Sequence, residues 1–422
     1  MRRPQHGALL VALLLVVAGC ASLGPVGDGE REPETATPTA PPPETSAPTR
    51  TATDPPSTAT PTPTPTTPEP VEPADVTVEG GELPVDVGRI YARVEALTGV
   101  EAEPPTVVVE DPRDDDPGGE RRGLLGALGL SGGSVDDLDC GTIASASAGS
   151  DEVRIVPDGL SAAEIELVLA HEFAHVLQEN NGLEGDVDRR DRDASFLRQA
   201  LTEGGAVYVA NEYAKAYDLT WATGDRPLEL RRCFYETAPD GFRTLTAVYY
   251  FGGEYFDRTL GDPSKFATAY ERLPNTTEGL LHGEPAGVDP PVPLDVETET
   301  DGWFDSSRGS YGELTTRLVL ASELSESRAA TAAEGWGNDE VVEFERDGET
   351  GYAWVHRWDD ADGADEFLAA VGDYAAARTE GPSVRVVRVD ETTTVLLVGE
   401  EAFLDATTVD RTGETVSVTV GN

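Results

Sequence analysis

The 422-residue chain carries 79 acidic residues against 31 basic ones, which gives a formal net charge of −48 at pH 7. Only two of the basic residues, Lys215 and Lys265, are lysines. This charge repels phosphate backbones, so we expect no nucleic-acid partner. An acidic excess with few lysines is typical of proteins that work in concentrated salt, which screens self-repulsion. An acidic disordered chain does not fit, because 38% of the residues are hydrophobic and those after position 80 are grouped periodically.

The first twenty residues predict a lipoprotein signal peptide. Two arginines at positions 2 and 3 precede an apolar run over 8–18, which is too short to span a bilayer. The following Val17-Ala18-Gly19-Cys20 resembles a lipobox. The resemblance implies that Cys20 is lipidated after cleavage, which places the protein on the outer face of the cell membrane with this anchor as its only membrane contact. The arginine pair leaves the export route open, because Pro4-Gln5-His6 matches a twin-arginine signal poorly.

Residues 21–75 are dominated by proline and threonine and contain almost no large apolar side chains. Such a segment cannot bury a core, so we expect a disordered stalk. At roughly 3.1 Å per residue in extended form, it would reach on the order of 100 Å from the membrane. Beyond it we predict two folded domains, over residues 76–325 and 326–422.

Two cysteines remain once Cys20 is assigned to the lipid anchor. Outside the cell, Cys140 and Cys233 are suited to form one disulfide bond. A pair of free, buried thiols is the alternative that the sequence leaves open.

The first predicted domain begins with alternating helical and strand patterns. We expect a helix over 85–97 and strands over 106–110, 142–146 and 152–156. Between them, the Gly- and Asp-rich stretch 111–134 contains an apolar insert, for which we expect a poorly ordered hairpin in preference to a flap or a lipid-contacting loop.

His171-Glu172-Phe173-Ala174-His175 lies inside an apolar run over 167–177. In a helix, the two histidines are one turn apart on the same face. They can share one tetrahedral Zn²⁺, while Glu172 takes a proton from a metal-bound water. Ser161 and Glu164 predict a capping box at the start of this helix, and Asn180-Asn181-Gly182 predicts its end.

A catalytic zinc site needs a third protein ligand. The next predicted helix, over 194–217, offers Glu203, and the small residues after it allow close helix packing. The acidic loop between the two helices, over 184–193, does not have the spacing of an EF-hand, so we expect it to be solvated. Gln178 and Asn181 occupy the places where metzincins carry Gly and His, which excludes that class.

His-Glu-Phe-Ala-His followed by a helical Thr202-Glu203-Gly204-Gly205-Ala206 resembles the gluzincin metallopeptidases, particularly the peptidase-MA-like group. The resemblance covers roughly residues 85–325 and implies an α+β, zincin-like fold. It also implies that His171, His175 and Glu203 bind zinc, and that Glu172 is the general base. By the same analogy, the strand before the zinc helix would hold an extended peptide substrate along its edge.

Two further segments fit this resemblance. Residues 249–256 resemble the later helix that closes the cleft, and 274–282 resemble the segment seen after it in related secreted proteins. A hydrolase of this kind needs a donor for the oxyanion. Tyr250 is our first choice because it lies in the predicted cleft-closing helix, and His282 is the alternative.

The C-terminal domain is predicted as a small α+β unit of unknown role. Strand patterns on either side of Asp347-Gly348 predict a hairpin, followed by a helix over 361–378 and strands over 383–389 and 392–398. The segment Gly335 to Asp339 resembles one that follows gluzincin-like cores in some haloarchaeal surface proteins. We expect Trp336, Trp354 and Trp358 to be core residues.

The sequence therefore predicts a cell-surface, lipid-anchored, zinc-dependent metallopeptidase that hydrolyses peptide bonds in a protein or peptide substrate. Two alternatives stay open. One is a pseudopeptidase that keeps the fold but serves in binding or envelope structure. The other is a lipid-anchored substrate-binding module in which the motif is incidental. No repeat and no ligand-pocket motif in the sequence supports this second alternative.

Overall fold

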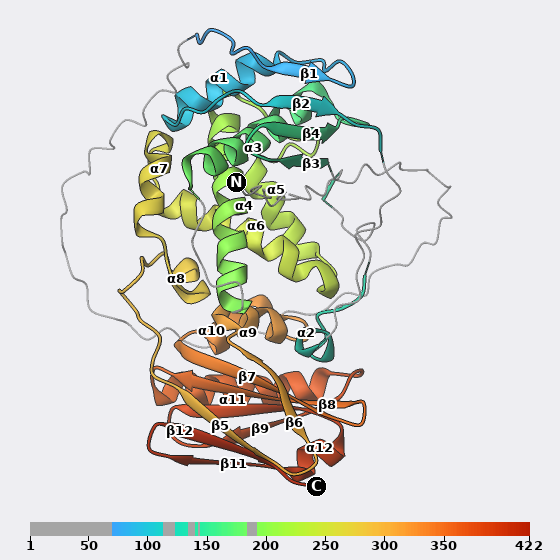
Figure 1. Cartoon of the computed structure of the whole chain (residues 1–422), viewed down its shortest axis with the longest axis vertical. Helices are drawn as coiled ribbons and strands as arrows, with labels where there is room; N and C mark the ends of the chain where they lie inside the picture. Colours follow the sequence, from blue (N-terminus) through green and yellow to red (C-terminus); the bar gives the residue numbers. More distant parts are fainter. Residues whose placement is uncertain (1–69, 113–122, 134–139, 142–143, 184–191) are drawn as a thin grey trace, which may run out of the picture. The chain divides into compact units, whose positions relative to one another are not determined.

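The computed structural model describes residues 70–112, 123–133, 140–141, 144–183 and 192–422. Within these ranges the chain is an α+β protein with twelve α-helices and three sheets (Figure 1). The predicted signal peptide, Cys20 and nearly all of the predicted stalk lie outside the described residues. None of the helices described is both long and apolar enough to cross a membrane.

A four-stranded sheet opens the fold. It consists of β1 (Thr77–Glu79), β2 (Thr106–Val109), β3 (Ser145–Ala148) and β4 (Glu152–Val156), in the order β1-β2-β4-β3. β3 is antiparallel to β4, whereas the other pairs are parallel. Because β4 is paired on both sides, its edge cannot receive a substrate strand. The prediction that placed the substrate along this strand is therefore wrong, and β3 is the outer strand next to it.

Helix α3 (Ala162–Asn181) follows β4 and carries the His-Glu-x-x-His motif. Its predicted capping box is confirmed: the Ser161 side chain accepts from the Glu164 backbone N–H, and Glu164 accepts from that of Ser161. Gly182 ends the helix in the left-handed conformation. Every side chain from 164 to 178 except Glu166 is buried, which is the pattern of a helix enclosed on nearly all sides. Helix α1 (Val87–Thr98) packs against it.

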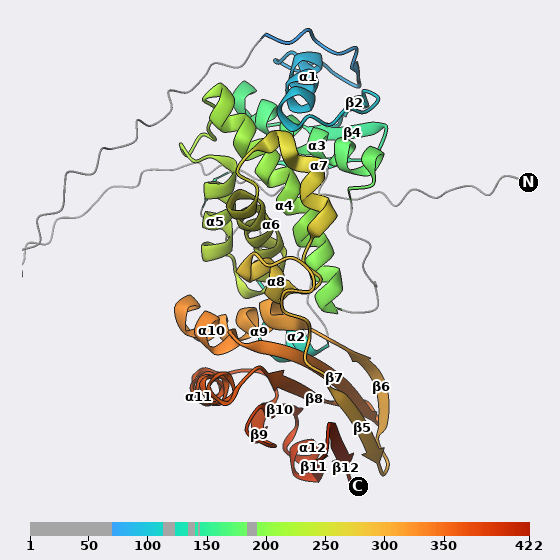
Figure 2. The same ribbon diagram turned by 90° about the vertical axis from the view of Figure 1, so that its left-hand side faces the viewer.

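Three more helices complete this part of the fold: α4 (Arg192–Tyr217), α5 (Pro227–Thr237) and α6 (Asp240–Thr259). Helix α4 packs against α3, and α5 and α6 pack against α4. Helices α4 and α6 lie side by side (Figures 1 and 2). A Cβ on Gly204 would lie 2.1 Å from the carbonyl carbon of Gly252, and one on Gly252 would lie 1.9 Å from the Ala200 oxygen. These glycines therefore set how closely the two helices approach.

The apolar insert is ordered and buried, so the expectation of a poorly ordered hairpin is wrong. Leu124–Ala127 forms the short helix α2, and Leu128 is fully buried. Two polar side chains from the C-terminal part fix its end: Tyr374 donates to the Leu128 oxygen and Arg378 to the Ala127 oxygen.

Short helices connect α6 to the C-terminal part of the chain. They are η2 (Pro263–Lys265), α7 (Phe266–Ala269), η3 (Tyr270–Arg272), α8 (Thr277–His282), α9 (Gly312–Ala321) and α10 (Glu326–Ala333).

The C-terminal part contains two sheets and two further helices. A five-stranded sheet has the order β6-β7-β8-β10-β9, and a three-stranded sheet the order β11-β12-β5. The elements are β5 (Asp295–Thr300), β6 (Phe304–Gly309), β7 (Trp336–Arg346), β8 (Glu349–Trp358), α11 (Ala361–Ala377), β9 (Ser383–Arg388), β10 (Thr393–Gly399), α12 (Glu401–Ala406), β11 (Thr407–Thr412) and β12 (Thr415–Val420). The hairpin at Asp347-Gly348 is confirmed, whereas the strands β5, β6, β11 and β12 were not predicted.

The five-stranded sheet is buried on both faces. Alternate residues of β10 show this: Leu396 belongs to the core that includes α11, and Leu397 to a second core shared with Val418 of β12. Figure 2 shows α11 on one side of the sheet and the three-stranded sheet on the other. The two sheets draw strands from both sides of the predicted boundary at 325/326. The three tryptophans predicted as core are 1% exposed.

Asp339, the last residue of the Gly-Trp-Gly-Asn-Asp segment, is a buried carboxylate at the base of this sheet. Its oxygens accept five hydrogen bonds, from the indole nitrogens of Trp336 and Trp354 and from three donors in the turn before α9. Those three are Ser310 Oγ and the backbone nitrogens of Tyr311 and Gly312. The segment therefore has a structural explanation, because it joins β7 and β8 to the start of α9.

Candidate metal centre

Helices α3 and α4 bring three ligand atoms together. His171 Nε2 and His175 Nε2 are 3.1 Å apart, and Glu203 Oε2 lies 3.4 and 3.3 Å from them. All three side chains are at least 94% buried. The sequence prediction thus named three residues that the fold places around one point.

These distances fit a tetrahedral zinc site. Zinc ligands lie about 2.0–2.1 Å from the metal, so two tetrahedral ligands are about 3.3 Å apart. The buried Glu203 Oε2 has no hydrogen-bond partner of acceptable geometry among the described residues. Three protein ligands with two nitrogens and one oxygen are also the donor set of catalytic zinc sites. The arrangement therefore fits a bound Zn²⁺.

Gln178 fixes the orientation of His175. Its amide nitrogen donates to the Thr202 oxygen (2.8 Å) and to the Tyr270 hydroxyl (2.7 Å), which turns its Oε1 toward His175 Nδ1 at 2.7 Å. The network assigns a proton to Nδ1 and leaves Nε2 as the nitrogen that faces the ligand cluster. Such outer contacts are what holds a metal-binding imidazole in place.

Glu172 is completely buried, and neither carboxylate oxygen has a hydrogen-bond partner among the described residues. Burial raises its pKa to about 8, which the neighbouring charge of His175 opposes. A buried carboxylate without partners is costly to fold and is uncommon outside functional sites.

Burial and mutual charge shift the pKa values of His171, His175 and Glu203 strongly. Burial lowers the pKa of His171 to about 3. Burial also acts to lower the pKa of His175, but the Glu203 carboxylate outweighs it and the pKa rises to about 9. Despite burial, the two histidines hold the pKa of Glu203 well below its usual range. The carboxylate is therefore ionised at neutral pH, as a metal ligand must be.

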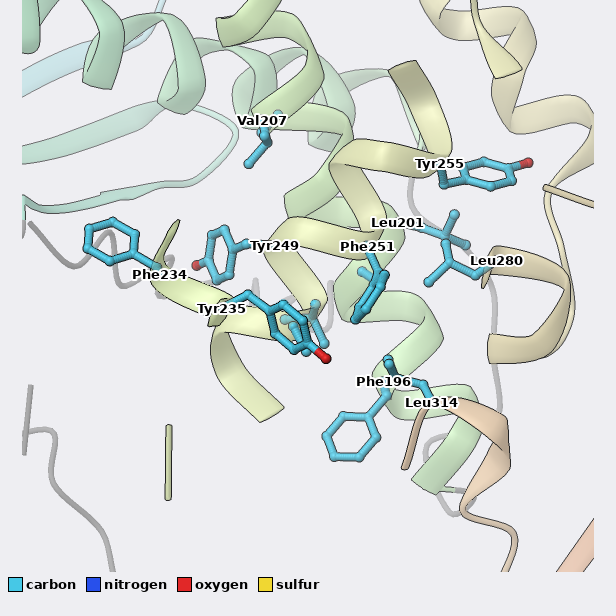
Figure 3. Close-up of a cluster of buried hydrophobic side chains, with 14 of the residues drawn as sticks. Phe196, Leu201, Val207, Phe234, Tyr235, Tyr249, Phe251, Tyr255, Leu280 and Leu314 are labelled. Atoms are coloured by element: carbon cyan, nitrogen blue, oxygen red, sulfur yellow. The ribbon is translucent and has the colours of Figure 1, made fainter. Parts of the chain in front are cut away.

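Tyr249, not Tyr250, faces this cluster. The Tyr249 ring stacks against His171 with centroids 6.3 Å apart and is 97% buried. Burial, and then the charge of Glu203, raise its pKa far above the ordinary value. Tyr250 packs instead on Tyr235 and is partly exposed. In Figure 3, the hydroxyls of Tyr249 and Tyr235 point in different directions.

The sequence contained a signal for this choice that the prediction did not use. Residues 242, 246, 249, 252 and 256 repeat at helical spacing along one buried face of α6. Gly252 on that face meets Gly204, the neighbour of Glu203. Tyr249 lies one turn before Gly252 and so faces α4 as well, whereas Tyr250 lies to one side.

Arg231 of α5 is a second group that the sequence reading missed. Its guanidinium lies over the Tyr249 ring, 4.7 Å from the centroid, and the side chain is 94% buried. Burial lowers its pKa, while Tyr249, Glu203 and Glu172 act to raise it. Among the described residues, no carboxylate forms an ion pair with it.

A small cavity of about 10 Å³ adjoins the cluster, with about the room that one water molecule needs. It is lined by His171 and Arg231 and by apolar side chains of α3, α4, α5 and the turn before α5. The described residues therefore bury the three candidate ligands, and the cavity beside His171 has about the volume of one water molecule.

Other residues singled out in the sequence lie elsewhere. His282 is in α8 and pairs with Glu313 at 3.0 Å, away from the His171, His175 and Glu203 cluster. Asp193 was expected in a solvated loop, but it is 4% exposed and accepts hydrogen bonds from the backbone and the hydroxyl of Thr277. The rest of the acidic loop lies outside the described residues. Cys140 and Cys233 are joined by a disulfide bond, which ties α5 to the segment before β3.

Comparison with known protein families gives a match in the C-terminal part of the chain. Residues 299–422 match the family described as a domain of unknown function, DUF8575. The match covers the five-stranded sheet, β11, β12 and the end of β5, and it excludes the candidate metal centre. No curated protein and no solved structure matches the chain.

Proposed function

We propose that the chain is a zinc-dependent metallopeptidase of the gluzincin type, with a zincin-like fold over its helical part. The observation that carries the proposal is the cluster of His171, His175 and Glu203, whose ligand atoms lie 3.1–3.4 Å apart beside the unpartnered carboxylate of Glu172. When bound, zinc lowers the pKa of a water molecule and polarises a substrate carbonyl.

Each of the surrounding residues has a role in this proposal. Glu172 accepts the proton of the attacking water at a carboxylate oxygen that forms no hydrogen bond with the described residues, and returns it to the leaving amine. Tyr249 and Arg231 are the donors best positioned for the negative charge that develops on the carbonyl oxygen. Gln178 holds His175 in the tautomer that binds metal.

Substrate binding requires that the enclosed site opens. We propose that α5 moves with Arg231, because this helix lines the small cavity together with α3 and α4. An extended peptide would then pair with β3, the outer strand next to β4. The substrate is a peptide or protein at the outer face of the membrane, where the predicted lipid on Cys20 tethers the chain.

A second candidate is a pseudopeptidase that keeps the metal and serves in binding or envelope structure. The enclosure of the ligands favours it, because a metal that substrate cannot reach only stabilises the fold. The two candidates agree on zinc and differ on cleavage.

The test combines a metal assay with a cleavage assay in strong salt. We expect one zinc per chain and cleavage of an unfolded protein by the wild type. Glu172→Gln should keep the zinc and abolish cleavage, and Glu166→Gln, a change on the same helix away from the ligands, should keep both. A chain without zinc would contradict both candidates. Zinc without cleavage across a broad peptide library would favour the pseudopeptidase.

A further inference from the structure

Three carboxylates that are distant in the sequence meet outside the candidate metal centre. Glu278 lies on α8, Asp289 in the loop that leads to β5, and Asp359 directly after β8. One carboxylate oxygen from each lies within 4.8 Å of those of the other two. Like charges so close together repel one another unless a cation or a proton separates them.

Glu278 distinguishes this cluster from an ordinary acidic surface. It is 95% buried, and its carboxylate forms no hydrogen bond or ion pair with the described residues. Burial, and then the charges of Glu313, Asp359 and Asp289, raise its pKa to about 9. A buried carboxylate that has no hydrogen-bond partner and lies beside two other carboxylates indicates a site for a ligand.

The fold ties the segments that carry Asp289 and Asp359 to the same strand, β7. The loop that carries Asp289 is attached to β7 by hydrogen bonds from the Val292 N–H to the Gly337 oxygen and from the Asn338 amide to the Val292 oxygen. Gly337 also approaches the third carboxylate, since a Cβ there would lie 2.8 Å from Asp359 Oδ1. The ligand atoms are therefore positioned before any ion binds.

We propose that Glu278, Asp289 and Asp359 bind a calcium ion that links α8 to the C-terminal sheet. Calcium is held by oxygen ligands at about 2.3–2.6 Å, so oxygens up to about 5 Å apart can share it. Magnesium requires shorter contacts, and zinc favours nitrogen and sulfur ligands. Water can complete the coordination from the exposed side, where Asp289 and Asp359 lie.

Equilibrium dialysis of the full chain with radioactive Ca²⁺ in molar NaCl tests this site. We expect one calcium per chain in the wild type and at least tenfold weaker binding in the double variant Asp289→Asn/Asp359→Asn. Both substituted side chains are exposed, so the variant should fold as the wild type does. The control Glu366→Gln/Glu391→Gln removes the same charge from exposed positions elsewhere and should bind as the wild type does. His175→Ala should also bind calcium, which separates this site from the zinc cluster.

Thermal unfolding gives an independent measurement, because a ligand that binds only the folded chain raises the midpoint. Added Ca²⁺ should raise the midpoint of the wild type and the control, but not that of Asp289→Asn/Asp359→Asn. The proposal is overturned if the wild type binds no calcium, if the variant binds it equally well, or if an equal concentration of Mg²⁺ displaces it.

Discussion

The carboxylates of Asp339 and Glu172 are both removed from water, yet their surroundings differ completely. Asp339 accepts five hydrogen bonds from β7, β8 and the turn before α9. Glu172 accepts none from the described residues, and Glu203 beside it keeps one oxygen without a hydrogen bond. A fully satisfied buried charge holds a fold together, whereas an unsatisfied one costs stability. The difference separates a structural carboxylate from groups positioned for a ligand or a reaction.

Removing a proposed zinc ligand should have the largest effect. His175→Ala deletes one of three ligands, so we expect zinc affinity to fall on the order of 10³-fold or more, roughly a third of the total binding free energy. Zinc content after dialysis measures this. The control His282→Ala removes a histidine that pairs with Glu313 and should keep one zinc per chain. Equal zinc loss in the two variants would contradict the assignment.

Removing the structural carboxylate should mainly destabilise the fold. Asp339→Ala leaves two indole donors and three turn donors buried without their acceptor, so we expect a loss of about 3–5 kcal/mol in the free energy of unfolding. Urea unfolding measures it. Glu366→Ala, at an exposed position of α11, should change the value by less than about 0.5 kcal/mol. If Asp339→Ala lowers the free energy of unfolding by as little as the control does, Asp339 is not the structural carboxylate that its five hydrogen bonds indicate.

Two adjacent tyrosines test the oxyanion donor. Tyr249→Phe should lower kcat/KM by about 10²–10³-fold, because it removes a donor that stabilises the developing charge. Tyr250→Phe, one residue further on α6, should change it by no more than about twofold. Both variants should retain zinc. If Tyr250→Phe has the larger effect, the original sequence-based choice was the right one.

The smallest effect concerns the stability of the metal-free chain. Because burial raises the pKa of Glu172 to about 8, its carboxylate is ionised only above that pH. At about pH 9, Glu172→Gln removes a buried charge without a partner among the described residues, so we expect the free energy of unfolding to rise by about 1 kcal/mol even though cleavage is lost. Urea unfolding after removal of metal measures it, with Glu166→Gln as the matched change on the same helix. A Glu172→Gln variant less stable than the wild type would show that Glu172 is held by contacts beyond the described residues.

Local patterns in the sequence were sufficient to predict α3 with its caps, the hairpin at Asp347-Gly348 and the buried tryptophans. Each depends on residues a few positions apart, whose preferences act before the chain folds. The outer sheet of β5, β11 and β12 could not be predicted in the same way, because β5 pairs with a strand about 120 residues later. The short helix α2 was missed since its order depends on contacts from Tyr374 and Arg378.

The sequence by itself predicted the candidate ligands His171, His175 and Glu203, since helical spacing puts two histidines on one face and the donor types suit zinc. Only the tertiary structure decided which side chains surround that set. Tyr249 rather than Tyr250 faces it because the contact of Gly252 with Gly204 sets the rotation of α6 against α4. Arg231 reaches it because α5 packs over the cavity. Those contacts join segments far apart in the chain, and no local pattern encodes them.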